Sequence, residues 1–220
     1  MERVDPSVPE TSTGSASGGH AGRPRQMSED ARRGQLVAAA GEIFLRNGYR
    51  ATTMADIAQC AGMSKKTVYQ IFTAKSELFE ALLTEWLAPF TVPVETAGRS
   101  PRDVLIDVLC RLVNFALSER QISMTRMMIA ETSHSEDIAV ALERQCLGRG
   151  KGALGQWLAA EAGLGTFKID DPEDAANMLF FAAAGDFLLG LLLRTRPRPS
   201  VEEVAARVGH AVAAFVQQVE

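Results

Sequence analysis

One stretch decides the fold of this chain: residues 52–72, which read TTMADIAQCAGMSKKTVYQIF. They predict two short helices joined by a tight turn. Thr53 is placed to cap the first helix with its side chain. Asp56 follows three residues later, where its carboxylate can accept a bond from the backbone of Thr53. Gly62 tolerates the positive φ that ends a helix, and Ser64 can cap the second helix. The stretch therefore predicts a helix-turn-helix.

The second of these helices has two faces of different chemistry. Val68, Ile71 and Phe72 can turn inward against a supporting helix. The outer face keeps these side chains: Lys65, Lys66, Thr67, Tyr69 and Gln70. A short helix that is held across a partner and presents cations and amides outward is what the major groove of DNA admits. The pattern therefore indicates a DNA-binding surface on residues 64–75.

A known family shares these residues at the same spacing. The match runs from about Arg32 to Leu83 and resembles the N-terminal DNA-binding domain of the tetracycline-repressor (TetR) family. It is carried by Gly48-Tyr49-Arg50-Ala51-Thr52-Thr53-Met54, Asp56-Ile57-Ala58, Ala61-Gly62-Met63-Ser64, Thr67-Val68-Tyr69, Phe72 and Lys75. Elsewhere, residues 129–131 and 171–193 are similar to the AefR-like class of regulatory domains. The resemblance implies an all-α fold with an N-terminal three-helix DNA-binding domain, which contains the helix-turn-helix, and a C-terminal helical ligand-binding and dimerisation domain.

The resemblance also assigns roles to DNA-binding residues. Base edges would be read by Lys65, Lys66 and Gln70, because lysine favours guanine acceptors and glutamine favours adenine. Phosphate contacts that set the register are expected from Thr53, Thr67, Tyr69 and Lys75. The alternative is that Tyr69 lies in the core and Lys75 is only solvated. Two departures from the family pattern would remove contacts: Ala55, where many relatives carry Arg, and Ile71, where many carry His or Tyr.

Charge is unevenly distributed along the chain. The net charge is −4 overall, +3 for residues 1–75 and −7 for residues 76–220. A basic end on an acidic body directs the basic end toward phosphate. Residues 1–26 are rich in Pro, Ser, Thr and Gly and are expected to form a disordered arm. Arg23 and Arg25 make this segment either an arm that touches DNA or a solvated tail.

Side chains with catalytic or metal-binding chemistry are scattered. The cysteines and histidines lie far apart: Cys60, Cys110, Cys146, His20, His134 and His210. This spacing fits reduced cytosolic thiols better than a disulfide framework or a structural zinc site. The chain lacks a P-loop, a nucleophile elbow and a zinc-protease pattern. We expect no enzymatic activity, no cofactor and no metal. Because residues 1–26 lack the apolar stretch of a secretory signal, we expect a cytoplasmic protein.

Caps and apolar spacing predict the remaining helices, within a DNA-binding domain over residues 27–75 and a regulatory and dimerisation domain over residues 76–220. They are expected at about residues 28–47, 75 to Pro89 or Pro93, 100–118, 123–133, 135–162 with a break near 148–152, 175–193 with its opening at residues 171–174, and from a capping box at Ser200 and Glu203 onward. Alternation typical of strands is not seen over any useful length.

The helix expected at residues 175–193 is the most apolar of the chain and nearly long enough to span a bilayer. Asn177 and Asp186 argue against a membrane span, because charge at mid-membrane is costly. Small residues from Ala182 to Gly185 favour close contact between helices. The family resemblance implies a homodimer in which two C-terminal helices of each subunit form a four-helix bundle, here through residues 172–219.

Side chains of the body could line an apolar effector pocket within about residues 100–190. The apolar candidates are Phe115, Met124, Met127, Met128, Trp157 and Phe181, and the polar anchors are Glu131 and Asp186. A buried carboxylate should meet Arg126, another polar partner or a ligand, because an unpaired charge is costly. The alternative is core packing, with Glu131 bonded to a neighbouring helix and Asp186 across the dimer axis.

These observations favour a ligand-responsive transcriptional regulator. It would bind a pseudo-palindromic double-stranded DNA operator as a dimer, most simply as a repressor that a small, apolar effector releases. The alternative is an effector-independent activator or architectural protein that uses the same DNA-binding domain. An enzyme with a helical body is the third hypothesis, and the sequence shows no site for it.

Overall fold

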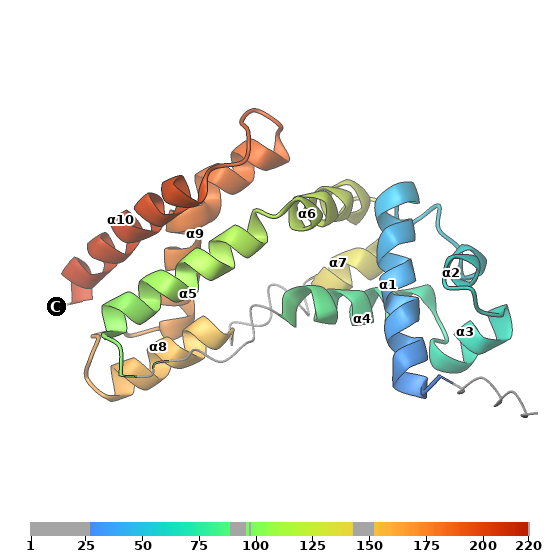
Figure 1. The fold of residues 1–220 in the computed structure, drawn as a ribbon, viewed down its shortest axis with the longest axis horizontal. Coiled ribbons are helices and arrows are strands. Elements are labelled where there is room, and N and C mark those ends of the chain that lie inside the picture. Colours follow the sequence, from blue (N-terminus) through green and yellow to red (C-terminus); the bar gives the residue numbers. More distant parts are fainter. Residues whose placement is uncertain (1–26, 89–95, 97, 143–151, 220) are drawn as a thin grey trace, which may run out of the picture.

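The computed structural model describes residues 27–88, 96, 98–142 and 152–219. This part of the chain contains helices and no strand, which confirms the all-α prediction. The helices are α1 (Glu29–Asn47), α2 (Met54–Cys60), α3 (Lys65–Ile71), α4 (Lys75–Leu87), α5 (Pro101–Ala116), α6 (Glu119–Thr132), α7 (Glu136–Leu142), α8 (Ala153–Gly163), α9 (Pro172–Leu192) and α10 (Val201–Val219). Figure 1 shows α1–α3 at one end, α5 and α8–α10 at the other, and α4, α6 and α7 between them.

Several helices begin at the caps that the sequence predicts. The backbone N–H of Ala31 donates to Ser28 Oγ at 3.2 Å. Thr53 and Asp56 form the reciprocal capping box. At α10, Ser200 N donates to Glu203 Oε2 at 2.8 Å, and Glu203 N donates to Ser200 Oγ at 3.2 Å. These short-range bonds satisfy N–H groups that have no partner inside their own helix.

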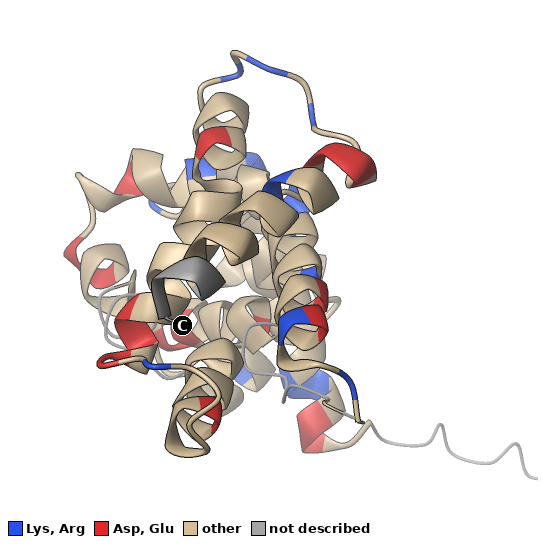
Figure 2. Cartoon of the chain, turned by 90° about the vertical axis from the view of Figure 1, so that its left-hand side faces the viewer, with Lys and Arg blue, Asp and Glu red and all other residues tan. Residues whose placement is uncertain are grey.

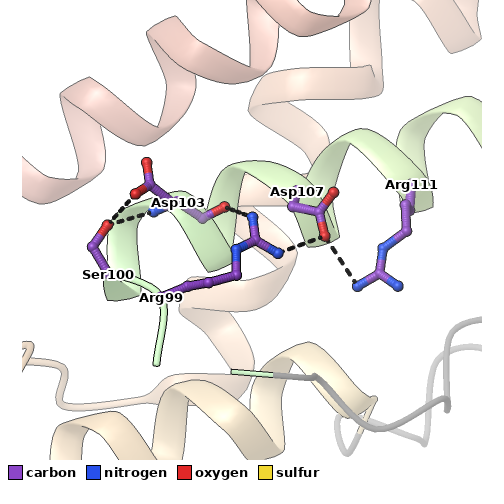
Figure 3. Close-up of polar contacts among 5 residues, drawn as sticks. All are labelled: Arg99, Ser100, Asp103, Asp107 and Arg111. Carbon is purple, nitrogen blue, oxygen red and sulfur yellow. Dashed lines mark hydrogen bonds and ion pairs between the residues drawn. The ribbon is translucent and has the colours of Figure 1, made fainter. Parts of the chain in front are cut away.

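The start of α5 is held by exposed polar side chains (Figure 3). Ser100 Oγ accepts a hydrogen bond from Asp103 N at 3.1 Å. Arg99 donates to the carbonyl oxygen of Asp103 and to Asp107 Oδ2, both at 3.2 Å. The guanidinium of Arg111 lies 3.5 Å from the same Asp107 oxygen. Each exposed ion pair adds little stability, but together they fix where the helix begins.

Some predicted boundaries are wrong. α6 begins one turn before the predicted start at Ser123, because Ser118 Oγ accepts a bond from Gln121 N at 3.4 Å. The predicted opening of α9 at residues 171–174 is confirmed: the helix begins at Pro172, and the Asp171 carboxylate accepts bonds from two backbone N–H groups. The helix predicted over 135–162 contains α7 and α8 at its two ends. Residues 143–151 between them, like the arm at 1–26 and the prolines at 89 and 93, lie outside the described residues.

The first hydrophobic core joins the helix-turn-helix to two helices of the body. It is built from α1–α4, together with Met124 and Met128 of α6 and residues 138 and 141 of α7. At its centre the rings of Phe44, Tyr49 and Phe79 pack against one another, with centroids between 5.1 and 5.9 Å apart. Burial of these side chains therefore fixes the position of α6 and α7 against the N-terminal helices.

The second core lies between α5, α8, α9 and α10. It is mostly aliphatic: Leu105 and Leu109 of α5 and Val208 of α10 are almost fully buried. Trp157 and Phe167 add an aromatic pair, with centroids 6.3 Å apart. The regular spacing of valines in α10, at positions 204, 208 and 212, places one face of that helix on this core.

Candidate DNA interface and regulatory region

The second helix of the helix-turn-helix, α3, is anchored by its inner face and open on its outer face. Val68 is fully buried and Phe72 is 1% exposed, whereas Tyr69 is 53% exposed. The alternative that Tyr69 lies in the core is therefore wrong. Lys65, Lys66 and Gln70 are also exposed. The outer face thus offers two cations, an amide and a phenol to a groove.

The turn before α3 is fixed by a bond from the supporting helix. Gln35 Nε2 on α1 donates to the carbonyl oxygen of Ala61 at 2.8 Å. Gly62 follows with a φ of 63°, the left-handed conformation expected there. Ser64 Oγ accepts from Thr67 N at 3.1 Å and lies 2.8 Å from the Thr67 hydroxyl. The hydroxyl of Thr67 therefore takes part in the helix cap, and its contact with phosphate stays a prediction.

Thr53 also serves as a cap. Its hydroxyl donates to Asp56 Oδ2 at 2.7 Å, and its backbone N–H donates to the same oxygen at 2.8 Å. The bonds from Thr53 hold the pKa of the Asp56 carboxyl below its usual range. Thr53 remains exposed, so its hydroxyl lies on the surface of the domain. A phosphate contact from Thr53 stays a prediction.

Lys75 has internal partners that the sequence did not indicate. Its ammonium donates to the carbonyl oxygens of Tyr49 at 2.8 Å and Thr52 at 2.9 Å. It also lies 4.3 Å from the centroid of the Tyr49 ring. Burial lowers the pKa of Lys75, and the nearby carboxylates of Asp137 and Glu131 oppose that shift. Lys75 is therefore not merely solvated: it binds the segment between α1 and α2.

The predicted effector residues do not converge on one place in the described structure. Met124 and Met128 are buried in the first core, and Met127 packs against it. Trp157 is buried in the second core, and Phe115 of α5 is half-buried. Phe181 is 62% exposed on α9.

The two carboxylates predicted as polar anchors have different surroundings. The side chain of Asp186 is 61% exposed and pairs with Arg196 and, at 3.6 Å, with Arg207. Glu131 is half-buried and accepts a hydrogen bond from Arg50 N at 3.2 Å. Asp186 therefore does not line an interior cavity here. Arg126 does not meet either carboxylate in the described contacts; it donates instead to the carbonyl oxygens of Leu191 and Leu192 at the end of α9.

Two open surface hollows occur among the described residues. One, of about 410 Å³, is lined by Arg50, Ala51, Glu131 and His134. The other, of about 450 Å³, is lined by Arg99, Asp103, Ile106, Asp107 and Cys110. Burial, with a smaller contribution from Asp107, raises the pKa of the Cys110 thiol, so the second hollow does not present a reactive thiolate. Neither hollow has the enclosed apolar walls predicted for an effector pocket.

One helix has an unusual surface. By length and composition, α9 is apolar enough to cross a membrane, with a mean hydropathy of 1.7 over its most apolar window. Only 33% of that window is buried in the molecule. Leu179, Ala183 and Phe187 face the second core, while Met178, Phe181 and Leu189 are at least half exposed. Figure 2, viewed from the end that carries α5 and α8–α10, shows long stretches of helix without charged residues, and basic residues along the α9–α10 connection.

Comparison with known proteins agrees with the geometry at both ends of the chain. Residues 36–82 match the model for bacterial regulatory proteins of the tetR family, and residues 103–218 match the AefR-like transcriptional repressor C-terminal domain. The first match spans the helix-turn-helix. The second begins in α5 and ends in α10, and it includes α6, α7 and the whole of the second core.

Curated relatives match part of the chain. The activator FasR of Mycolicibacterium smegmatis is 41% identical over 81 residues, which are 37% of each protein. The repressor ComR of Escherichia coli is 30% identical over 97 residues, which are 42% of this chain and 44% of ComR. The chain thus matches less than half the length of these relatives.

A solved structure extends the likeness in fold. A TetR-family regulator from Mesorhizobium loti superposes with a TM-score of 0.73 over 88% of this chain and 98% of that protein, at 22% identity. At this identity the likeness concerns the fold. With family models matched over both the helix-turn-helix and the helical body, the chain belongs to the TetR family of DNA-binding transcriptional regulators, with an AefR-like C-terminal domain.

Proposed function

We propose that this chain is a cytoplasmic repressor that binds a pseudo-palindromic operator as a homodimer and is released by a small, largely apolar effector. The observation that carries the proposal is the outer face of α3. It presents Lys65, Lys66 and Gln70 to solvent, while Val68 holds the helix against the first core. A helix fixed in this way can enter the major groove without the entropy loss of becoming ordered on binding.

Dimerisation would cover the exposed face of α9. Met178 and Phe181 lie three residues apart, Leu189 and Leu193 lie four apart, and each of the four is about 60% exposed. Large exposed apolar side chains gathered on one helix mark a contact surface, and a symmetric dimer covers it with its own copy. Ala183, by contrast, is 2% exposed and faces the second core of its own chain, so it lies outside the exposed face of α9.

The effector would bind within the body. Trp157 is 7% exposed, and its indole N–H has no hydrogen-bond partner in the described structure. An unpaired buried donor is costly, so a ligand that brings a hydrogen-bond acceptor to this group would bind favourably. We therefore expect an effector with an apolar frame and at least one acceptor.

The second candidate function is activation of transcription. It is favoured by the name of FasR, which is called an activator and is 41% identical over its matched 81 residues. Both functions use the same DNA-binding surface, and they differ in where the operator lies relative to a promoter. Enzymatic activity would need a clustered set of catalytic groups and is not proposed.

The test is footprinting of the full-length protein on duplexes selected from a random library. We expect a protected inverted repeat whose two halves are one helical turn apart, about 34–36 Å. Gln70→Ala should relax the base preference at one position of each half, by about 1–3 kcal/mol. Unselective protection of all duplexes, or an unchanged base preference for Gln70→Ala, would remove this assignment of the recognition helix.

A further inference from the structure

Three other helices hold the segment that connects α1 to α2, residues 48–52. Tyr49 Oη donates to Asp137 Oδ2 of α7 at 3.2 Å. Arg50 N donates to Glu131 Oε2 of α6, also at 3.2 Å. From α4, the Lys75 ammonium binds two carbonyl oxygens of the same segment. Two of these helices, α6 and α7, belong to the body of the protein.

The contact with Glu131 is close on both of its carboxylate oxygens. A Cβ built on Gly48 would lie 2.5 Å from Glu131 Oε1, which no side chain could tolerate without moving the carboxylate. Gly48 also has a φ of 81°, a conformation that favours glycine. Gly48 therefore permits two things at once: the turn that ends α1 and the approach of a carboxylate from the body.

The contact with Asp137 is made by a rigid side chain. Tyr49 is 2% exposed, and its ring packs between Phe44 and Phe79. Burial, together with the neighbouring Asp137 carboxylate, raises the pKa of Tyr49. The phenol therefore stays protonated at neutral pH and donates its proton to the carboxylate from a fixed position.

The helix-turn-helix follows directly after this segment. α2 begins at Met54, capped by Thr53, and Gln35 fixes the turn between α2 and α3. α6 is in turn bonded to α9, because Arg126 Nε donates to the carbonyl oxygen of Leu192 at 3.2 Å. A continuous set of hydrogen bonds thus runs from α9, through α6 and Glu131, to the start of the helix-turn-helix.

We propose that Glu131 and Asp137 are positioning residues for operator recognition, which fix the angle of the helix-turn-helix against the body. In the dimer of the proposed function, on which this inference rests, that angle sets the distance between the two α3 helices. The carboxylates do not touch DNA. They make the dimer selective for one spacing of the two operator halves.

Operator spacing provides the test. The wild-type protein first selects its inverted repeat from random duplexes. Affinity is then measured for this duplex, for versions with one or two base pairs added or removed between the halves, and for a single half-site. The variants are Glu131→Ala, Glu131→Gln, Asp137→Asn and Tyr49→Phe. Matched controls are Glu119→Gln and Glu136→Gln. Both residues are exposed acids, and each is the first residue of the helix that carries a tested carboxylate, α6 and α7 respectively.

We expect Glu131→Ala and Tyr49→Phe to reduce the preference for the selected spacing by about tenfold, with half-site binding within about twofold of wild type. Glu131→Gln keeps an oxygen that can accept from Arg50 N and should retain most of the preference. Tyr49→Phe keeps the ring in its packing and removes only the hydroxyl, so it tests the geometry without unfolding the domain. The controls should behave as wild type.

The outcomes separate the two proposals. If the variants lose affinity equally for every spacing and for the half-site, Glu131 and Asp137 only stabilise the domain, and the inference is wrong. Unchanged spacing preference in Glu131→Ala and Tyr49→Phe also overturns it, while the dimeric regulator stands. If the wild-type protein itself shows no preference for spacing, the dimeric operator complex is wrong and the inference falls with it.

Discussion

The two hydrophobic cores of this molecule end differently at its surface. The first, formed by α1–α4 with α6 and α7, encloses Leu36, Phe44 and Phe79 completely. The second, formed by α5 and α8–α10, leaves a stripe of large apolar side chains on α9 in contact with water, Phe181 and Leu189 among them. Apolar surface that stays exposed does not contribute the stabilisation of about 25 cal/mol per Å² that its burial would give. We infer that the first core is complete within one chain and that the second requires another molecule.

Tryptophan fluorescence can test whether the two cores are separate cooperative units. The chain has two tryptophans: Trp86 packs against the first core and Trp157 lies in the second. In a Trp157→Phe background, Phe44→Ala should destabilise the unit that Trp86 reports by about 3–5 kcal/mol in urea, because it leaves a large cavity. In a Trp86→Phe background, the same substitution should leave the Trp157 transition almost unchanged.

The reciprocal substitution is Leu109→Ala in the second core, where Leu109 is fully buried. It should lower the stability that Trp157 reports by about 2–5 kcal/mol and leave the Trp86 transition in place. If either substitution shifts both transitions equally, the cores unfold as one unit, and the contrast between them concerns only their surfaces.

The next effect concerns the open face of the second core. Leu189→Glu places a charge in the proposed dimer interface and should weaken dimerisation at least a hundredfold, by about 3 kcal/mol. Light scattering at micromolar concentration would then report a monomer with unchanged Trp157 fluorescence. Leu164→Glu is the matched control, because Leu164 is 78% exposed at the end of α8 and does not belong to the exposed face of α9. A dimeric Leu189→Glu variant would contradict the interface.

A smaller effect separates two roles for Lys75. If its ammonium binds phosphate, Lys75→Ala should reduce the slope of log affinity against log salt by about 1. The observed bonds to Tyr49 and Thr52 favour a different result: a lower melting temperature with the salt slope unchanged. Lys66→Ala, at an exposed position of α3, should reduce the slope and serves as the positive control. If both variants reduce the salt slope equally, Lys75 binds phosphate and belongs to the DNA-binding surface.

Prediction from sequence succeeded where a residue's partners are close along the chain. Thr53 and Asp56 lie three residues apart, and so do Ser200 and Glu203, so their caps could be read directly. The side chains on the outer face of α3 could be predicted from their spacing along the helix. The bonds of Lys75, Glu131 and Asp137 join residues that are 23 to 88 positions apart, and no local pattern encodes such pairs.

The effector residues show the same limit. Met124 and Trp157 both have the composition of a pocket wall, yet they lie in different cores. Apolar side chains at helical spacing predict burial but do not say against which neighbour. Asp186 was expected inside the body because its sequence neighbours are apolar, and it lies on the exposed side of α9, where arginines from outside that helix reach it.

The smallest expected effect is the pH dependence of the capping box at the start of α2. Bonds from the Thr53 hydroxyl and backbone N–H hold the pKa of Asp56 below its usual value. A carboxyl group with a lowered pKa in the folded state contributes stability above its ordinary pKa and loses it as the pH falls through the folded value. Asp56→Asn should therefore destabilise the first core at neutral pH, and the difference from wild type should shrink as the solution becomes acidic.

The measurement is the Trp86 unfolding transition in urea, followed from neutral to acidic pH in the Trp157→Phe background. The Trp157 transition, measured in the Trp86→Phe background, should show no such difference between Asp56→Asn and its parent, because the capping box begins α2, whose buried side chains pack in the first core. A difference that stays constant down to low pH would mean that the carboxylate charge does not stabilise this helix start.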